Sequence, residues 1–219
     1  MLRRVFVAGL ALLAVSAVSA PPQPRPVSGQ VRVRLVTSMG AITLALDAKR
    51  APRTVANFLA YVDDGRLEGT NFYRTARRKT EPTKGFIQGG VGTDARRMLD
   101  PLPLEPTSKT GLKHLSGTIS MAHGPNPNSA NGNFSIMVGD NPGLDARGAN
   151  LGFAAFGQVI GGMDVVQRIL ALPSGGGRDV MKGQMILKPV TIVRAERLDG
   201  VAKPTGRVRP WLLGLKPAS

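Results

Sequence analysis

The chain has 219 residues and no cysteine, which excludes a disulfide framework and lipid attachment through an N-terminal cysteine. Its 29 Lys and Arg against 14 Asp and Glu give a formal net charge of +15, which favours encounters with anionic surfaces such as lipids and cell-envelope polymers. Nucleic acid is a less favoured partner, because the basic residues are dispersed and only 5% of the residues are aromatic. We favour solubility and adhesion to anionic surfaces as the explanations of the positive net charge.

The first twenty residues have the layout of a secretory signal peptide. Arg3 and Arg4 precede an apolar stretch over 5–18, and the segment that ends at Ala20 is typical of a cleavage site. A retained membrane anchor is the alternative, but this apolar run is shorter than the roughly 20 residues that span a bilayer. We therefore expect export and cleavage after Ala20, which leaves 27 basic and 14 acidic side chains in the mature chain.

One domain is predicted for residues 31–198, between two segments of different composition. Residues 21–30 are rich in proline and are predicted to form a short extended linker. Residues 199–219 form a basic segment with several prolines and the lone Trp211. Trp211 could dock on the domain or on a partner, although a flexible tail is the simpler expectation.

Eight short segments of the domain have the pattern of strands, and two have the pattern of helices. Residues 31–37 and 41–47 alternate apolar with polar side chains, and six further strands are expected over 70–74, 86–89, 118–122, 134–138, 154–160 and 190–196. Amphipathic helices are predicted from Pro52 to just before Gly65 and over 163–170. This order predicts a mainly β fold, a closed antiparallel eight-stranded barrel capped by two helices.

Several motifs follow one another at a characteristic spacing. They are Phe72-Tyr73-Arg74, Gln88-Gly89-Gly90, Gly117-Thr118-Ile119-Ser120-Met121-Ala122 and Gly132-Asn133-Phe134-Ser135-Ile136. In this order, over about 31–198, the chain resembles the cyclophilin-type peptidyl-prolyl isomerases of the bacterial periplasmic branch. The resemblance implies a cyclophilin-like barrel in the periplasm that accelerates rotation about X–Pro bonds, with proline-containing polypeptides of exported proteins as its partners.

The reaction implied by this resemblance requires no nucleophile, metal or cofactor. Rotation about a peptide bond faces a barrier of about 18–20 kcal/mol, and a hydrogen bond donated towards the amide nitrogen lowers it by localising the lone pair. By its place in the first motif, Arg74 is expected to be this donor, because its guanidinium stays charged. His114 and His123 are the only histidines, so no metal site is expected.

The resemblance also assigns a substrate groove. Gln88 and Asn133 are expected to hold substrate carbonyls, while an edge strand pairs with the main chain of the bound peptide. The edge strand consists of Met121, Ala122 and His123, and the remaining groove residues are Phe86, Ser135, Leu144 and Phe153.

The proline pocket of the family is aromatic, and in this chain it is depleted. Ser135 stands where a phenylalanine usually forms the floor, Gly143 stands where Trp or Phe is usual, and the basic segment 75–85 shifts Phe86 from the usual Phe-Met pair. Loss of such a surface costs about 1–3 kcal/mol of proline binding. Two alternatives to a fully active isomerase therefore stay open: a peptide-binding chaperone with little turnover, and a basic envelope protein that binds an anionic polymer.

Overall fold

The computed structural model describes residues 28–212. The signal peptide predicted for residues 1–20 lies outside the described residues, as does most of the predicted linker over 21–30. Within residues 28–212, no helix has the length and apolar character needed to cross a membrane.

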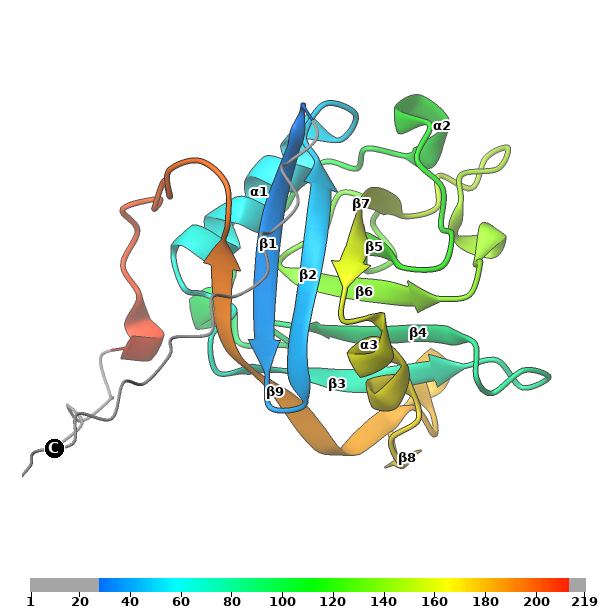
Figure 1. Ribbon diagram of the computed structural model, residues 1–219. Coiled ribbons are helices and arrows are strands. Elements are labelled where there is room, and N and C mark those ends of the chain that lie inside the picture. The colour runs from blue at the N-terminus through cyan, green and yellow to red at the C-terminus, as the bar shows by residue number, and fades with distance from the viewer. Residues whose placement is uncertain (1–27, 213–219) are drawn as a thin grey trace, which may run out of the picture.

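Nine antiparallel strands form a single sheet that closes on itself (Figure 1). Their order is β1-β2-β7-β5-β6-β4-β3-β9-β8, and closure results because β1 also pairs with β9. Eight strands therefore make the barrel, and the two-residue β8 is an extra edge beside β9, so the predicted fold class is confirmed. The strands are β1 (Gln30–Thr37), β2 (Gly40–Asp47), β3 (Thr70–Arg77), β4 (Gly85–Gly90), β5 (Thr118–Met121), β6 (Asn133–Val138), β7 (Ala154–Gly161), β8 (Ser174–Gly175) and β9 (Met185–Arg197).

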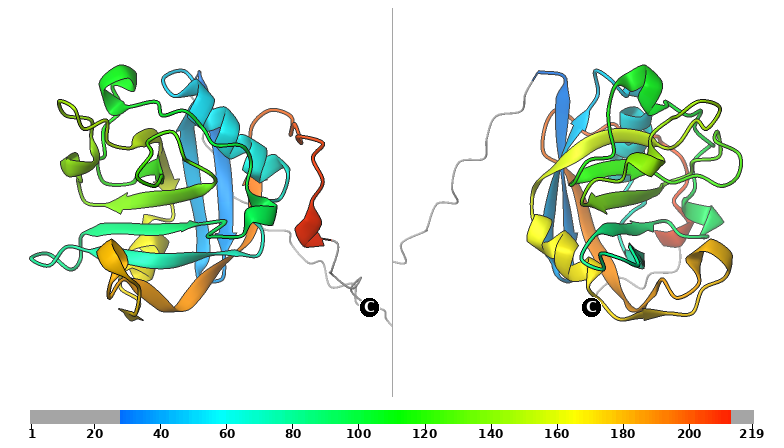
Figure 2. Two further views of the ribbon diagram at one scale, coloured as in Figure 1. Left: turned by 180° about the vertical axis from the view of Figure 1, so that it is seen from behind. Right: turned by 90° about the vertical axis from the view of Figure 1, so that its right-hand side faces the viewer.

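Two of the three α-helices are those that the sequence predicts. They are α1 (Pro52–Asp63) and α3 (Met163–Leu170), which lie on opposite sides of the barrel (Figures 1 and 2). The third helix, α2 (Thr107–Thr110), is a single turn that ends at Gly111 in the left-handed conformation. Four residues carry no periodic signal, and for this reason the sequence did not predict α2.

Four phenylalanine rings form the centre of the core. Phe134 of β6 makes edge-to-face contacts with Phe58 of α1 and with Phe72 of β3, at ring-centroid distances of 5.4 and 5.6 Å. Phe156 of β7 packs on Phe58 at 5.3 Å. This cluster fixes the inner faces of β3 and β6, so the side chains that alternate with Phe72 and Phe134 face outward.

A β-bulge in β3 turns Arg74 to the outer surface. Phe72 pairs with Gly89 and Arg74 with Gln88, so Tyr73 is the extra residue. A regular strand with Phe72 inside would also turn Arg74 inward, because side chains alternate. The bulge shifts the alternation by one residue, so Tyr73 and Arg74 both face outward and Thr75, which is 1% exposed, returns to the interior.

The last strand is longer than the predicted 190–196. It begins at Met185, and its pairing with β3 is interrupted: Arg74 lies opposite Met185 and Phe72 opposite Val190. Pro189, which has no N–H to donate, lies in the unpaired stretch between these partners.

The C-terminal segment packs against the barrel as far as Leu212, so the expectation of a flexible tail from Asp199 onward is wrong over that range. Asp199 forms an ion pair with Arg32 of β1 at 2.8 Å. Trp211 is buried against the guanidinium groups of Arg66 and Arg97, which lie 4.8 and 5.1 Å from its ring centroid. Composition alone could not reveal these contacts, because their partners are distant in the sequence.

Candidate active site

A row of polar side chains crosses the outer surface of four neighbouring strands. Arg74 of β3 pairs with Gln88 of β4, Gln88 pairs with Ser135 of β6, and Ser135 pairs with Ser120 of β5. Adjacent strands are about 4.8 Å apart, so residues in register line up across the sheet. Phe86 and Met137 form the next outward-facing pair along β4 and β6, two residues further on.

This row lies in a groove with a cavity volume of about 560 Å³. Nine of the ten residues that the sequence assigns to the site line it: Arg74, Phe86, Gln88, Met121, Ala122, His123, Ser135, Leu144 and Phe153. Ser120 and Met137 also line the groove, although no motif assigned them to it, and period-two alternation from Ile119 and Phe134 could have placed them here. Val180 and Met181 line it as well, but they come from a distant turn and carry no local signal.

Arg74 is held in a fixed orientation. Its Nη1 donates to Gln88 Oε1 at 2.8 Å, its Nε donates to Gln184 Oε1 at 2.9 Å, and its guanidinium lies 5.2 Å from the centroid of the Phe86 ring. Its Nη2 has only a long contact of 3.5 Å with the Val180 carbonyl. Desolvation by burial lowers the pKa of Arg74 from its usual value, but an arginine keeps its proton in proteins. The groove thus contains a charged donor with one free edge.

Comparison with known proteins identifies the family. The family model described as cyclophilin type peptidyl-prolyl cis-trans isomerase/CLD matches residues 32–197. The chain belongs to the cyclophilin family. It is 37% identical over 171 residues to peptidyl-prolyl cis-trans isomerase A of Dickeya dadantii, covering 77% of this chain and 85% of that protein. It is 33% identical over 164 residues to peptidyl-prolyl cis-trans isomerase B of Escherichia coli, covering 71% and 96%.

A solved structure supports the fold of this cyclophilin independently. The cyclophilin-type peptidyl-prolyl cis-trans isomerase of Cryptosporidium parvum superposes with a TM-score of 0.59 at 22% identity, over 78% of this chain and 99% of that one. With the family match and the bacterial relatives, the predicted family and the predicted peptidyl-prolyl isomerase activity are confirmed.

A hydrogen-bonded chain behind the groove fixes Ser120 in this cyclophilin. His114 Nδ1 lies 2.7 Å from Asp145 Oδ1, and His114 Nε2 lies 2.8 Å from Ser120 Oγ. A carboxylate only accepts, so Nδ1 carries the proton. Desolvation by burial lowers the pKa of His114 although Asp145 opposes this, so the ring is neutral and Nε2 accepts from the Ser120 hydroxyl. The imidazole therefore sets the direction of one groove hydroxyl.

We expect the buried His114 to make folding stability depend on pH. Because its pKa is lowered in the folded state, the unfolded chain binds the proton more readily. The contribution of His114 is complete above the unfolded value of about 6.5 and is lost as the pH falls below it. The free energy of unfolding, measured with urea, should decrease between pH 7.5 and pH 5.5. This decrease should be smaller in His114→Gln than in the wild type. Histidine resonances in NMR provide the direct check, and protonation of His114 at or above pH 6.5 would contradict the assignment.

One wall of the groove is an aromatic stack. The His123 and Phe153 rings lie nearly parallel with centroids 4.3 Å apart. The nitrogens of His123 lie 2.7 Å from the Gly124 carbonyl oxygen and 2.9 Å from that of Gly152, which fixes the ring at the groove edge. Phe86 also lines the groove, so two phenylalanine rings remain although the floor is Ser135.

Asn133 is the one predicted site residue that does not line the groove. Its Oδ1 accepts from Gly92 N at 2.8 Å and from the Tyr73 hydroxyl at 3.1 Å, and its Nδ2 donates to the Gly92 carbonyl at 2.9 Å. Through these bonds, Asn133 connects β6 to the turn after β4. Its predicted contact with a substrate carbonyl is therefore not supported by its present position.

Proposed function

We propose that Arg74 is the electrostatic catalyst of X–Pro rotation in this cyclophilin. In the planar ground state the amide lone pair is delocalised, and it becomes a hydrogen-bond acceptor only as the bond twists. A donor placed at that nitrogen therefore stabilises the transition state more than the bound substrate. The observation that carries the proposal is the fixed guanidinium, whose Nε and Nη1 are occupied by Gln184 and Gln88 while its Nη2 is left with a long contact.

The proposed substrate is an extended proline-containing segment that pairs with the main chain after β5. The N–H and the carbonyl of His123 have no hydrogen-bond partner among the described residues, and Ala122 N donates to Asn133 O at 2.9 Å, which anchors this edge. An added strand would satisfy these groups. The proline ring would then lie over Ser135 and Met137, between Phe86 and Phe153. A protease-coupled isomerisation assay with a proline tetrapeptide tests this function, and absence of acceleration by the purified chain would refute it.

The biological setting that we propose is the folding of exported proteins in the periplasm. The basic and apolar sequence before Ala20 supports it. Mass spectrometry of the chain from the periplasmic fraction of producing cells should show Pro21 as the first residue. A chain that is found only in the cytoplasm with residues 1–20 intact would contradict this proposal.

A peptide-binding chaperone with slow turnover is the second candidate, and the serine floor is the observation that favours it. Ser135 is 8% exposed and presents no ring to the substrate, and a Cβ at Gly143 would meet no atom within 4 Å. Neither residue therefore contributes a ring to the surface beneath a bound proline.

Restoring a ring to the floor should raise activity. We expect Ser135→Phe to increase kcat/KM on a proline tetrapeptide several-fold, since the ring adds apolar contact worth about 1–2 kcal/mol, partly offset by crowding against Met137. Ser135→Ala is the matched control, because it removes the hydroxyl without adding a ring, and its kcat/KM should stay within about twofold of the parent. Lower activity in Ser135→Phe with an unchanged Tm would show that the groove is shaped around a different floor.

Association with anionic envelope surfaces is a further part of the proposal. It rests on the excess of basic over acidic side chains, which are 27 and 14 after removal of residues 1–20. Retention on vesicles that contain phosphatidylglycerol should weaken steeply as salt rises to about 0.3 M, because salt screens such contacts. Equal retention on neutral vesicles would remove charge as the cause.

A further inference from the structure

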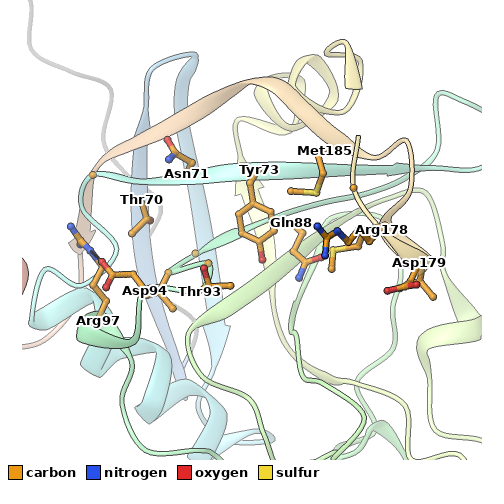
Figure 3. A pocket seen from close by; sticks show the side chains of 17 residues that line it. Thr70, Asn71, Tyr73, Gln88, Thr93, Asp94, Arg97, Arg178, Asp179 and Met185 are labelled. Atoms are coloured by element: carbon orange, nitrogen blue, oxygen red, sulfur yellow. Dashed lines mark ion pairs between the residues drawn. The ribbon is translucent and has the colours of Figure 1, made fainter. Parts of the chain in front are cut away.

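A second cavity, of about 890 Å³, adjoins the groove. It shares Gln88, Val180 and Met181 with the groove, so one ligand can contact both cavities. In Figure 3, Tyr73 and Gln88 lie between Thr70, Asp94 and Arg97 on one side and Arg178 and Asp179 on the other. The bulge in β3 explains the arrangement, because it turns Tyr73 towards this cavity and Arg74 towards the groove.

The interior of this cavity is suited to an apolar group. Val91, Val180, Met181 and Met185 contribute apolar side chains, and methionine adapts its shape and contacts aromatic rings favourably. Burial raises the pKa of Tyr73 to about 12, so its hydroxyl is neutral at physiological pH.

Two of the charged groups around the cavity already have partners. Arg97 Nη1 donates to the carbonyls of Arg66 and Glu68 at 2.9 and 2.8 Å. Asp94 accepts from the Arg96 side chain at 2.9 Å. These pairings leave apolar contact as the main attraction that this end of the cavity offers.

The turn between the two cavities holds apolar side chains out to solvent. Val180 is 79% exposed and Met181 is 38% exposed, in the 3₁₀ turn η3 (Asp179–Met181). The turn is closely packed on itself, because a Cβ on Gly177, at φ +78°, would meet the Met181 carbonyl oxygen at 2.3 Å. Val180 and Met181 line both cavities, so a ligand that spans the two cavities would cover this exposed apolar pair.

We propose that this cavity is an accessory subsite that binds one large apolar side chain, aromatic by preference, of the polypeptide whose X–Pro bond lies in the groove. The proposal rests on the proposed function of the groove. Continuity through Gln88, Val180 and Met181 favours a segment of the same polypeptide over a separate ligand. The volume accommodates a phenylalanine side chain with its flanking backbone. The enzyme would thus act preferentially on prolines close to an aromatic residue, as in unfolded chains before core formation.

A phenylalanine scan tests the subsite. The parent peptide has eight residues with one central proline and glycine elsewhere, and a single Phe replaces each glycine in turn. The isomerisation rate is measured by NMR exchange spectroscopy, and each kcat/KM is divided by that of the parent, so that changes in the basal rate cancel. We expect a ratio of about ten at one or two positions, which corresponds to about 1.4 kcal/mol of apolar contact.

Two tryptophan variants locate the effect. Thr93→Trp places an indole in the cavity from an exposed turn position, and we expect the ratio to fall to about one. Ala95→Trp adds the same ring at a neighbouring exposed residue that does not line the cavity, so its ratio should remain that of the wild type. Met185→Gln keeps the side-chain volume but adds an amide, and it serves as a second cavity variant if Thr93→Trp does not fold.

The outcomes separate the subsite from the groove. Turnover of the parent peptide with ratios near one at every position would overturn the subsite alone. If the tenfold preference for a Phe peptide persists in both Thr93→Trp and Met185→Gln, the phenylalanine binds elsewhere, and the proposed subsite is likewise overturned. Absence of turnover for the parent peptide would instead refute the proposed function of the groove.

Discussion

We expect Arg74→Ala to lower kcat/KM on a proline tetrapeptide by about 100-fold, the effect typical of removing one preorganised donor from a transition state. The Tm should change little, because the side chain is only partly buried and its partners Gln88 and Gln184 line the surface. A protease-coupled assay with thermal unfolding of the same sample measures both quantities. An unchanged rate in Arg74→Ala would remove this residue from the mechanism.

Two further variants separate charge from geometry. Arg74→Lys keeps the charge but loses the planar fork, so it cannot bond Gln88 and Gln184 while donating to the substrate, and it should lose nearly as much activity as Arg74→Ala. Gln184→Ala leaves the guanidinium with one fixed partner, and a several-fold decrease in kcat is expected with KM nearly unchanged. Full activity of Arg74→Lys would show that a positive charge at this position is sufficient for catalysis without the planar guanidinium.

Among the substitutions proposed for this protein, we expect Trp211→Ala to lower the free energy of unfolding most. A buried indole removes about 150–250 Å² from water, worth at most about 4–6 kcal/mol, and the entropy of the released segment offsets part of this. A decrease of about 2–3 kcal/mol in the free energy of unfolding is the expected result, equivalent to a Tm lower by about 5–10 °C. Leu212→Ala changes an exposed neighbour and should have no effect.

The same variant tests whether the C-terminal segment belongs to the folded domain. Asp64 accepts two hydrogen bonds from Thr205. Desolvation by burial raises the pKa of Asp64, but these bonds and Arg66 together outweigh it, so the pKa lies below its usual value. These bonds remain in Trp211→Ala, but Trp211 is the one buried side chain of residues 199–212, so the variant should expose residues 206–212 to proteolysis. The tetrapeptide rate should stay unchanged because Trp211 does not line the groove. An unchanged Tm and unchanged proteolysis would show that the segment does not pack in solution.

The barrel could be predicted because its signals are local. The alternation in 31–37 and 41–47 and the spacing of apolar residues in α3 depend only on neighbouring residues, and these elements lie where the sequence predicts them. The groove residues followed from their family motifs, since period-two alternation cannot be applied to Arg74 without knowledge of the bulge at Tyr73.

What could not be predicted depends on contacts between distant residues. The turn that carries Val180 and Met181 reaches the groove through Gln184 and Arg74, which are 110 positions apart. Asn133 has the side chain expected of a substrate ligand, but the turn at Gly92 satisfies it instead. The packing of Trp211 on Arg66 and Arg97 likewise follows from the tertiary fold and has no local pattern.

The most direct measurement of the central claim is the cis–trans exchange rate of a proline peptide while it is bound, obtained by NMR line-shape analysis at saturating enzyme, together with its Kd. If Arg74 acts on the twisted amide, Arg74→Ala slows the bound exchange by about 100-fold and changes Kd by less than about threefold. If the bound exchange rate is unchanged and Kd rises in proportion to the loss of kcat/KM, Arg74 only binds the substrate and the account of catalysis is wrong.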